Sequence, residues 1–116
     1  MKRVRVVHGG SGVGLGTEVA VADSWWRRLR GLLAHPPMEA GEGLLLLRCS
    51  SVHTAGMTYP IDVAFLDEDG TVVRGISRLV PWRVGLGGAG AAHALELPAG
   101  RLQETETVPG VRLTWS

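Results

Sequence analysis

The sequence predicts a mainly β domain, an antiparallel sandwich or small barrel of about seven or eight short strands with one packed helix near residues 24–34. Glycine (17) and proline (6) make up about a fifth of the 116 residues, which favours many turns and disfavours a helical bundle. Short segments with strand patterns recur along the chain, whereas one stretch has clear helical periodicity. Because strands and helices do not alternate, no βαβ sheet is expected.

The first half of the chain is predicted to contain strands at Val4–Val7 and Thr17–Ala22, where apolar and polar residues alternate. Asp23 resembles a helix N-cap, and the apolar residues after it recur at helical spacing. His35-Pro36-Pro37 ends this segment, because proline disfavours helical geometry in the residue before it. The face expected to pack on the sheet consists of Trp25, Leu29, Leu32 and Leu33.

In the second half, the continuous apolar run Leu44–Leu47 is typical of a strand buried on both faces. Ile61–Leu66 and Thr71–Ile76 are joined by Asp67–Gly70, which predicts a β-hairpin with Gly70 at positive φ. Gly85–Gly90 matches G-x-G-x-x-G, but it lacks the strand–loop–helix context of a dinucleotide site and is expected to be a mobile loop. The remaining predicted elements are strands at Ala92–Leu97 and Val111–Trp115 and one helical turn within Arg101–Glu106.

Charge and cysteine content bear on the class of partner and on the compartment. Twelve basic and eleven acidic residues give a formal net charge of +1, which carries no electrostatic signature of nucleic-acid or membrane binding. Cys49 is the single cysteine, so no internal disulfide can form. No apolar h-region of a signal peptide follows the basic N-terminus. We therefore expect one cytoplasmic domain over residues 1–116, a monomer or weak homodimer, without cofactor or metal.

The candidate functional residues are polar side chains within apolar segments. Asp62 and Glu96 both lie in strand-like apolar runs, where an isolated charge is unfavourable. One interpretation is structural: each carboxylate accepts backbone N–H bonds or meets an arginine such as Arg28 or Arg30. The other is functional: both line a cleft with His53 as acid/base groups or oxygen ligands.

Cys49 and His53 invite a second chemical interpretation, that of an activated thiol nucleophile. Their separation of four residues would bring them together only on a helix, and the segment looks extended or looped. We therefore expect Cys49 to be a buried structural thiol.

Three segments resemble signatures of the uncharacterised bacterial and archaeal family known as domain of unknown function 192 (DUF192). They are Arg28–Leu33, Ser51–Asp67 and Leu95–Gly100, in the expected order. The resemblance implies a compact, mainly β domain with a helix packed on it, and it implies no activity. The family pattern points to four positions as the ones to examine for a role: Met57, Asp62, Glu96 and Gly100. The chain departs from the family pattern at Gly56, where many members have an aromatic residue, and at Leu33, where many have methionine.

Three functions remain open. The first, which we favour because no complete catalytic constellation is visible, is a non-catalytic domain that binds a small molecule or a protein partner. Its candidate ligand-binding residues are His53, Met57, Asp62 and Glu96. The second is a small hydrolase-like enzyme that uses Asp62, Glu96 and His53. The third is a structural or chaperone-like module with exposed tryptophans, which predicts a contiguous apolar patch.

Overall fold

The mainly β class is confirmed in the computed structural model, which describes residues 2–22 and 37–116. The predicted helix near residues 24–34 lies outside this described part. The described strands are β1 (Arg3–His8), β2 (Gly14–Ala22), β3 (Glu42–Leu46), β4 (Ser51–His53), β5 (Ile61–Leu66), β6 (Val72–Leu79), β7 (Val84–Leu86), β8 (His93–Pro98) and β9 (Leu113–Trp115). One short helix, α2 (Arg101–Glu104), precedes β9.

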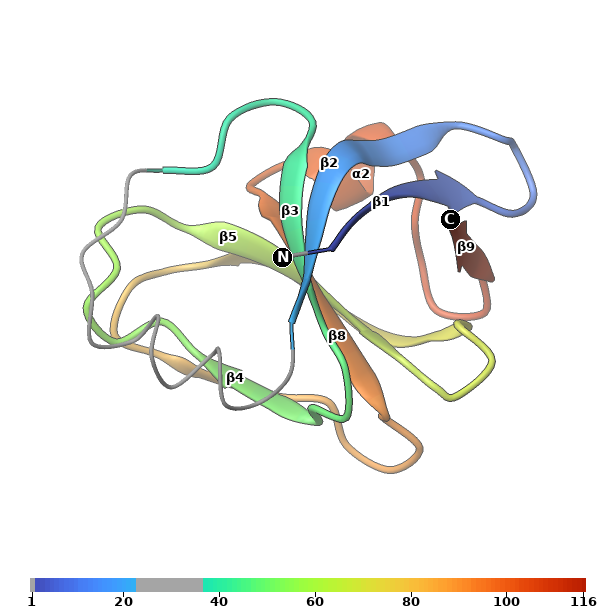
Figure 1. The fold of residues 1–116 in the computed structure, drawn as a ribbon. Helices are drawn as coiled ribbons and strands as arrows, with labels where there is room; N and C mark the ends of the chain where they lie inside the picture. Colours follow the sequence, from blue (N-terminus) through green and yellow to red (C-terminus); the bar gives the residue numbers. More distant parts are fainter. Residues whose placement is uncertain (1, 23–36) are drawn as a thin grey trace.

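Seven of these strands form one strongly curled sheet in the order β6-β5-β8-β3-β2-β1-β9 (Figure 1). The two ends of this order approach each other, because the start of β9 and the residues before it bond to the β5–β6 turn and to the start of β6. The Leu113 N–H donates to the Gly70 carbonyl at 2.9 Å, and the Val72 N–H donates to the Val111 carbonyl at 2.8 Å. The sheet therefore curls into a half-barrel whose open side is crossed by the C-terminal segment.

Most strand pairs are antiparallel, as predicted, but β2 and β3 run parallel. A parallel pair needs a long crossover connection, and residues 23–41 supply it. The mainly antiparallel arrangement predicted from the sequence is therefore confirmed, with this one parallel pair as an addition. A single parallel pair leaves no repeating strand–helix rhythm in the sequence.

The curled sheet separates two clusters of buried apolar side chains. The inner cluster fills the concave side and is closed by Leu102 of α2; its other members include Val6, Leu15, Val19, Leu45, Ala64, Leu66, Leu95, Leu97 and Leu113. The outer cluster covers the opposite face of the central strands; it includes Leu44, Leu46, Val52, Met57, Ile61, Val63, Phe65 and Ala94. Because β5 lies between the two clusters, all six of its residues are buried.

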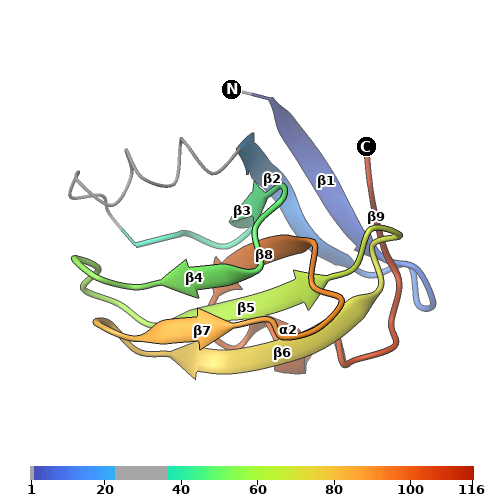
Figure 2. The same ribbon diagram turned by 90° about the horizontal axis from the view of Figure 1, so that it is seen from below.

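Strands β4 and β7 pair with each other as a separate two-stranded sheet. In Figure 2 this small sheet forms a layer beside β5 and β6. A Cβ added at Gly85 would lie 3.0 Å from the Ile76 side chain, and one added at Gly87 would lie 2.7 Å from the Phe65 ring. The glycine-rich segment Gly85–Gly90 is therefore not a plain loop: it begins in β7, and its first two glycines allow close packing.

Two local predictions are confirmed by the backbone. Gly70 of the β5–β6 turn has φ 85°, and Asp67 closes that turn by accepting hydrogen bonds from the Asp69 and Thr71 N–H groups, each at 2.9 Å. The predicted helical turn after Pro98 is α2, with Gly100 at φ 95° as its N-cap.

Candidate functional site

The Asp62 carboxylate is fully buried on the inner side of β5, and both of its oxygens are hydrogen-bonded. Oδ1 accepts a bond from the Arg78 N–H at 2.9 Å, and Oδ2 accepts one from the Leu102 N–H at 2.9 Å. The first bond stabilises an irregular point in β6, where Arg78 has φ 54°. The second takes up a free N–H of the first turn of α2, which the N-cap Gly100 has no side chain to satisfy. These two hydrogen bonds explain how the ionisable Asp62 side chain can be fully buried.

Helix α2 is also fixed from its exposed side, by the Arg101 guanidinium. Nε donates to the Leu15 carbonyl at 3.0 Å, and Nη2 donates to the Gly14 carbonyl at 2.6 Å. Nη1 forms an ion pair with Glu104 at 2.9 Å. Asp62 and Arg101 therefore hold the helix against β5 and β2.

Glu96 lies on the neighbouring strand β8 but on the other face of the sheet. In the register of β5 and β8, Asp62 is opposite Leu97 and Glu96 is opposite Val63. Because side chains alternate between faces, Asp62 shares the inner face with Ala64, and Glu96 shares the outer face with Ala94. Glu96 is buried, with 3% of its surface exposed, and it interacts with another group of the protein. The sheet thus brings the two segments together while directing the two carboxylates to opposite sides.

The remaining predicted site residues lie in different surroundings. His53 is exposed on β4 and is paired in register with Val84 of β7. Met57 is buried in the outer cluster, as is Cys49, whose Sγ lies 2.9 Å from the Ser51 carbonyl oxygen. The burial of Cys49 is as the sequence predicted. His53 and Asp62 therefore share no face, and the acid/base set proposed from the sequence does not converge on one cleft.

Among the described residues, four of the six large apolar side chains that are exposed lie in β7 or just before it, and we call these four the β7 surface: Val80, Trp82, Val84 and Leu86. Trp82 is 68% exposed, Val84 66% and Leu86 59%. Val84 and Leu86 share the outer face of β7, since the intervening Gly85 is buried against Ile76 and Leu79. Such a group of neighbouring exposed apolar residues is typical of an interaction surface.

Thr54 fixes the loop that carries Trp82. Its hydroxyl donates to the Val80 carbonyl at 2.6 Å and accepts a bond from the Arg83 N–H at 2.9 Å, and its carbonyl accepts one from the Trp82 N–H at 3.1 Å. The Trp82 backbone has φ 62°, an unfavourable region for a bulky residue. These bonds hold Trp82 in an exposed position against local strain.

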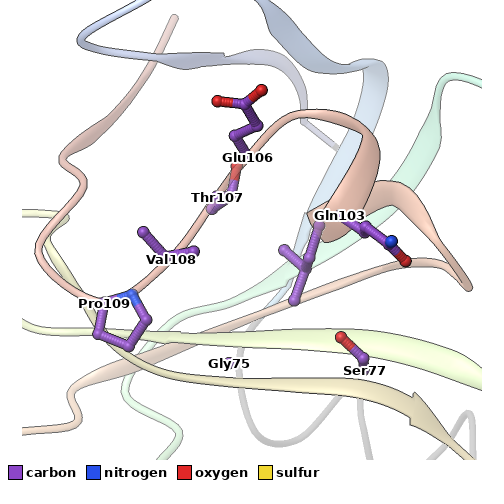
Figure 3. A pocket seen from close by; sticks show the side chains of 8 residues that line it. Gly75, Ser77, Gln103, Glu106, Thr107, Val108 and Pro109 are labelled. Atoms are coloured by element: carbon purple, nitrogen blue, oxygen red, sulfur yellow. The ribbon is translucent and has the colours of Figure 1, made fainter.

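A groove of about 610 Å³ lies between β6 and the segment that follows α2. Gly75 and Ser77 form one side, Val108 and Pro109 the other, and Leu102 lies between them. Figure 3 shows the Glu106 carboxylate pointing away from Gly75 and Ser77. The hydroxyl of Thr107 lies 2.7 Å from that of Thr105, so this part of the lining is already hydrogen-bonded internally. The groove offers shape but no charged group directed into it.

Two kinds of feature are absent from the described ranges, 2–22 and 37–116. No three His, Cys, Asp or Glu side chains there are grouped so that they could hold a metal ion. No helix there is both long and apolar enough to cross a membrane.

Taken together, the described residues form a small half-barrel β domain whose candidate acid/base groups are dispersed and which exposes several apolar side chains in β7 and in the loop before it. The chain belongs to the DUF192 family, described as Uncharacterized ACR, COG1430, whose model matches residues 6–115. The resemblance found in the sequence is thereby confirmed.

Relatives and solved structures agree with this assignment. The chain is 34% identical over 101 residues to a UPF0127 protein of Pyrococcus horikoshii, covering 84% of this chain and 87% of that protein. It is 29% identical to a UPF0127 protein of Pyrococcus abyssi, covering 84% and 86%. These names give no activity.

Two crystal structures have the same fold. One, from Sinorhizobium meliloti and provisionally named a transcription regulator, has a TM-score of 0.81 and 27% identity, covering 97% of this chain and 92% of that one. A protein of unknown function from Novosphingobium aromaticivorans has a TM-score of 0.80 and 21% identity, covering 97% and 84%. The second likeness concerns the fold alone.

The β7 surface was not among the residues singled out from the sequence. A signal was present, because Val80, Trp82, Val84 and Leu86 alternate with other residues at the period of a strand. The neighbouring glycines led to a loop interpretation instead.

Proposed function

We propose that the domain is a non-catalytic protein-binding module that uses the β7 surface. The observation that supports this most directly is the exposure of Trp82 together with Val84 and Leu86 on a rigidly held strand and loop. Tryptophan is enriched among the residues that dominate binding energy at protein interfaces. The hydrolase-like alternative lacks comparable support, because Asp62 is engaged with two backbone N–H groups and Glu96 faces the other side of the sheet.

The role of the predicted ligand-binding residues changes accordingly. His53 belongs to the proposed surface, because it lies beside Val84 on the outer face of the β4–β7 pair. Met57 supports the layer from within the outer cluster. We further propose that the domain acts in the cytoplasm, where a buried single thiol such as Cys49 remains reduced. Fractionation of cells that express the full chain tests this location.

The binding proposal is tested by selecting random peptides displayed on phage against the purified chain. We expect the selected peptides to bind at least about tenfold more weakly to the double variant Trp82→Ser/Leu86→Ser, since an exposed aromatic anchor and its apolar neighbour are lost. Isothermal titration calorimetry measures the dissociation constants. Val108→Ser is the matched control, because Val108 is a similarly exposed valine beside the groove, and it is expected to leave the affinity unchanged.

Two outcomes would contradict the proposal. In the first, the selected peptides bind the double variant and the wild type equally well. In the second, binding is lost instead in Gly75→Val, which adds a side chain in the groove between β6 and α2; that result would assign ligand binding to the groove.

A further inference from the structure

The backbone of β7 has an open edge, which bears on what kind of partner the β7 surface fits. The Arg83 carbonyl accepts a bond from the Thr54 N–H at 2.9 Å, and the Gly87 N–H donates to the Ser50 carbonyl at 2.8 Å. In an antiparallel pair, residues bonded to the partner strand alternate with residues that are not. Gly85 therefore faces β4, while Val84 and Leu86 direct their N–H and C=O groups away from it.

Within the described residues, β4 is the only strand paired with β7. The outward Leu86 carbonyl accepts a bond from Arg74 Nη1 at 2.6 Å. The outward N–H and C=O of Val84 have no partner among the described groups. An open strand edge with exposed apolar side chains is a template for another extended chain, and a charged side chain on the edge is a common protection against unselective pairing. Arg74, which bonds to the outward Leu86 carbonyl, can protect the edge in this way.

The segments that carry β4, β6 and β7 contain basic but no acidic residues. The sequence contains no Asp or Glu between Asp69 and Glu96, nor between Glu42 and Asp62, and these two stretches include β4, β6 and β7. Arg74 touches Leu86, Arg83 directly precedes Val84, and His53 is paired with Val84. A partner of complementary charge is therefore acidic.

We propose that the β7 edge binds an extended acidic segment of a partner protein, one whose backbone pairs with Val84 and Leu86 and whose acidic side chains meet Arg74 and Arg83. This inference rests on the proposed function and names the class of partner. Main-chain bonds would give affinity, and alternate side chains would give specificity, as in other cases of strand addition. The carboxylates of the segment would draw the Arg74 guanidinium away from the Leu86 carbonyl, which opens that acceptor to the incoming strand.

Other occupants fit this edge less well. A second copy of the chain would bring Arg74 and Arg83 against their own counterparts, and like charges disfavour such a pair. Single-stranded nucleic acid is bound largely by aromatic stacking, whereas Trp82 is accompanied here by the aliphatic residues Val80, Val84 and Leu86. A lipid surface would leave the Val84 N–H and C=O without hydrogen-bond partners.

The test uses synthetic peptides about seven residues long, close to the usual length of a strand. One peptide alternates glutamate with valine, and the second replaces each glutamate with lysine. Trp82 fluorescence reports binding, with Trp82→Phe identifying its share of the signal. We expect the glutamate peptide to bind at least about tenfold more tightly than the lysine peptide at about 50 mM salt, and to weaken at about 500 mM salt because the charges are screened.

Two variants separate backbone pairing from charge. Val84→Pro removes the outward N–H, and proline is tolerated on strand edges, so the β4–β7 pair is expected to persist. It should weaken binding of the glutamate peptide by at least about tenfold, since one main-chain bond and its neighbours are lost. The double variant Arg74→Gln/Arg83→Gln should also weaken binding of the glutamate peptide by at least about tenfold. It should not weaken binding of the lysine peptide. Circular dichroism melts confirm that each variant is folded.

The inference is overturned if both peptides bind equally well, or if folded Val84→Pro binds like the wild type. It is also overturned if vesicles of anionic lipid or oligodeoxythymidine bind the β7 surface more tightly than the glutamate peptide does. If phage-selected peptides depend on Trp82 and Leu86 but are not acidic, the binding function holds and its acidic specificity fails. If no peptide depends on the β7 surface, the proposed function itself fails.

Discussion

Replacing Asp62 with asparagine is expected to lower the free energy of unfolding by about 2–4 kcal/mol, because a buried N–H group loses its charged acceptor. The asparagine side chain offers one oxygen and one NH₂ group. It can therefore accept a bond from either the Arg78 or the Leu102 N–H, but not from both as the carboxylate does. The other N–H would face a donor in a site that water does not reach. Urea denaturation measures the change.

Asp69→Asn is the matched control, since Asp69 is exposed in the β5–β6 turn. Its replacement should change stability by less than about 0.5 kcal/mol. If Asp62→Asn were as stable as the wild type, or more stable, the structural role assigned to Asp62 would be wrong. A more stable variant is what a strained functional carboxylate would give.

Replacing Gly87 with alanine is expected to destabilise the protein by about 1–3 kcal/mol through overpacking. The added Cβ would lie 2.6 Å from the Ala91 Cβ and 2.7 Å from the Phe65 ring. Phe65 is completely buried in the outer cluster, so neither neighbour can move without displacing others. Thermal unfolding followed by circular dichroism measures the loss.

Gly14→Ala serves as the control for this change. The nearest atoms to its added Cβ belong to the Arg5 side chain at 3.9 Å, an ordinary contact. Its stability should stay within about 0.5 kcal/mol of the wild type. Equal stability of Gly87→Ala and Gly14→Ala would show that the segment after β7 is not tightly packed on β5.

The elements that the sequence predicted well are those whose local signals agree with their tertiary surroundings. The β5–β6 hairpin combines two apolar runs with a turn that needs Asp67 and Gly70. The buried run at β3 reflects a strand covered on both faces. By contrast, β4 and β7 have three residues each, and the glycines beside β7 favour a loop interpretation over the alternation that runs from Val80 to Leu86.

The candidate site was harder to predict, because it depends on register. The sequence singled out the Asp62 and Glu96 segments, which the structure pairs as neighbouring strands. It could not show that Asp62 pairs with Leu97 instead of Glu96, and a difference of one residue moves a side chain to the other face. The bonds from Arg78 and Leu102 to Asp62 join residues far apart in the chain, so no local pattern reveals them.

The most direct test of the β7 surface as the binding site is an NMR titration of the ¹⁵N-labelled chain with a phage-selected peptide. We expect the amide signals that shift most to belong to the four residues of the β7 surface and to His53, because these groups would lie nearest the peptide. The Val84 amide should also become protected from hydrogen exchange, since its outward N–H gains a partner. The largest shifts at Gly75, Ser77 and Val108, with the Val84 amide unprotected, would contradict the account and place the binding site in the groove beside α2.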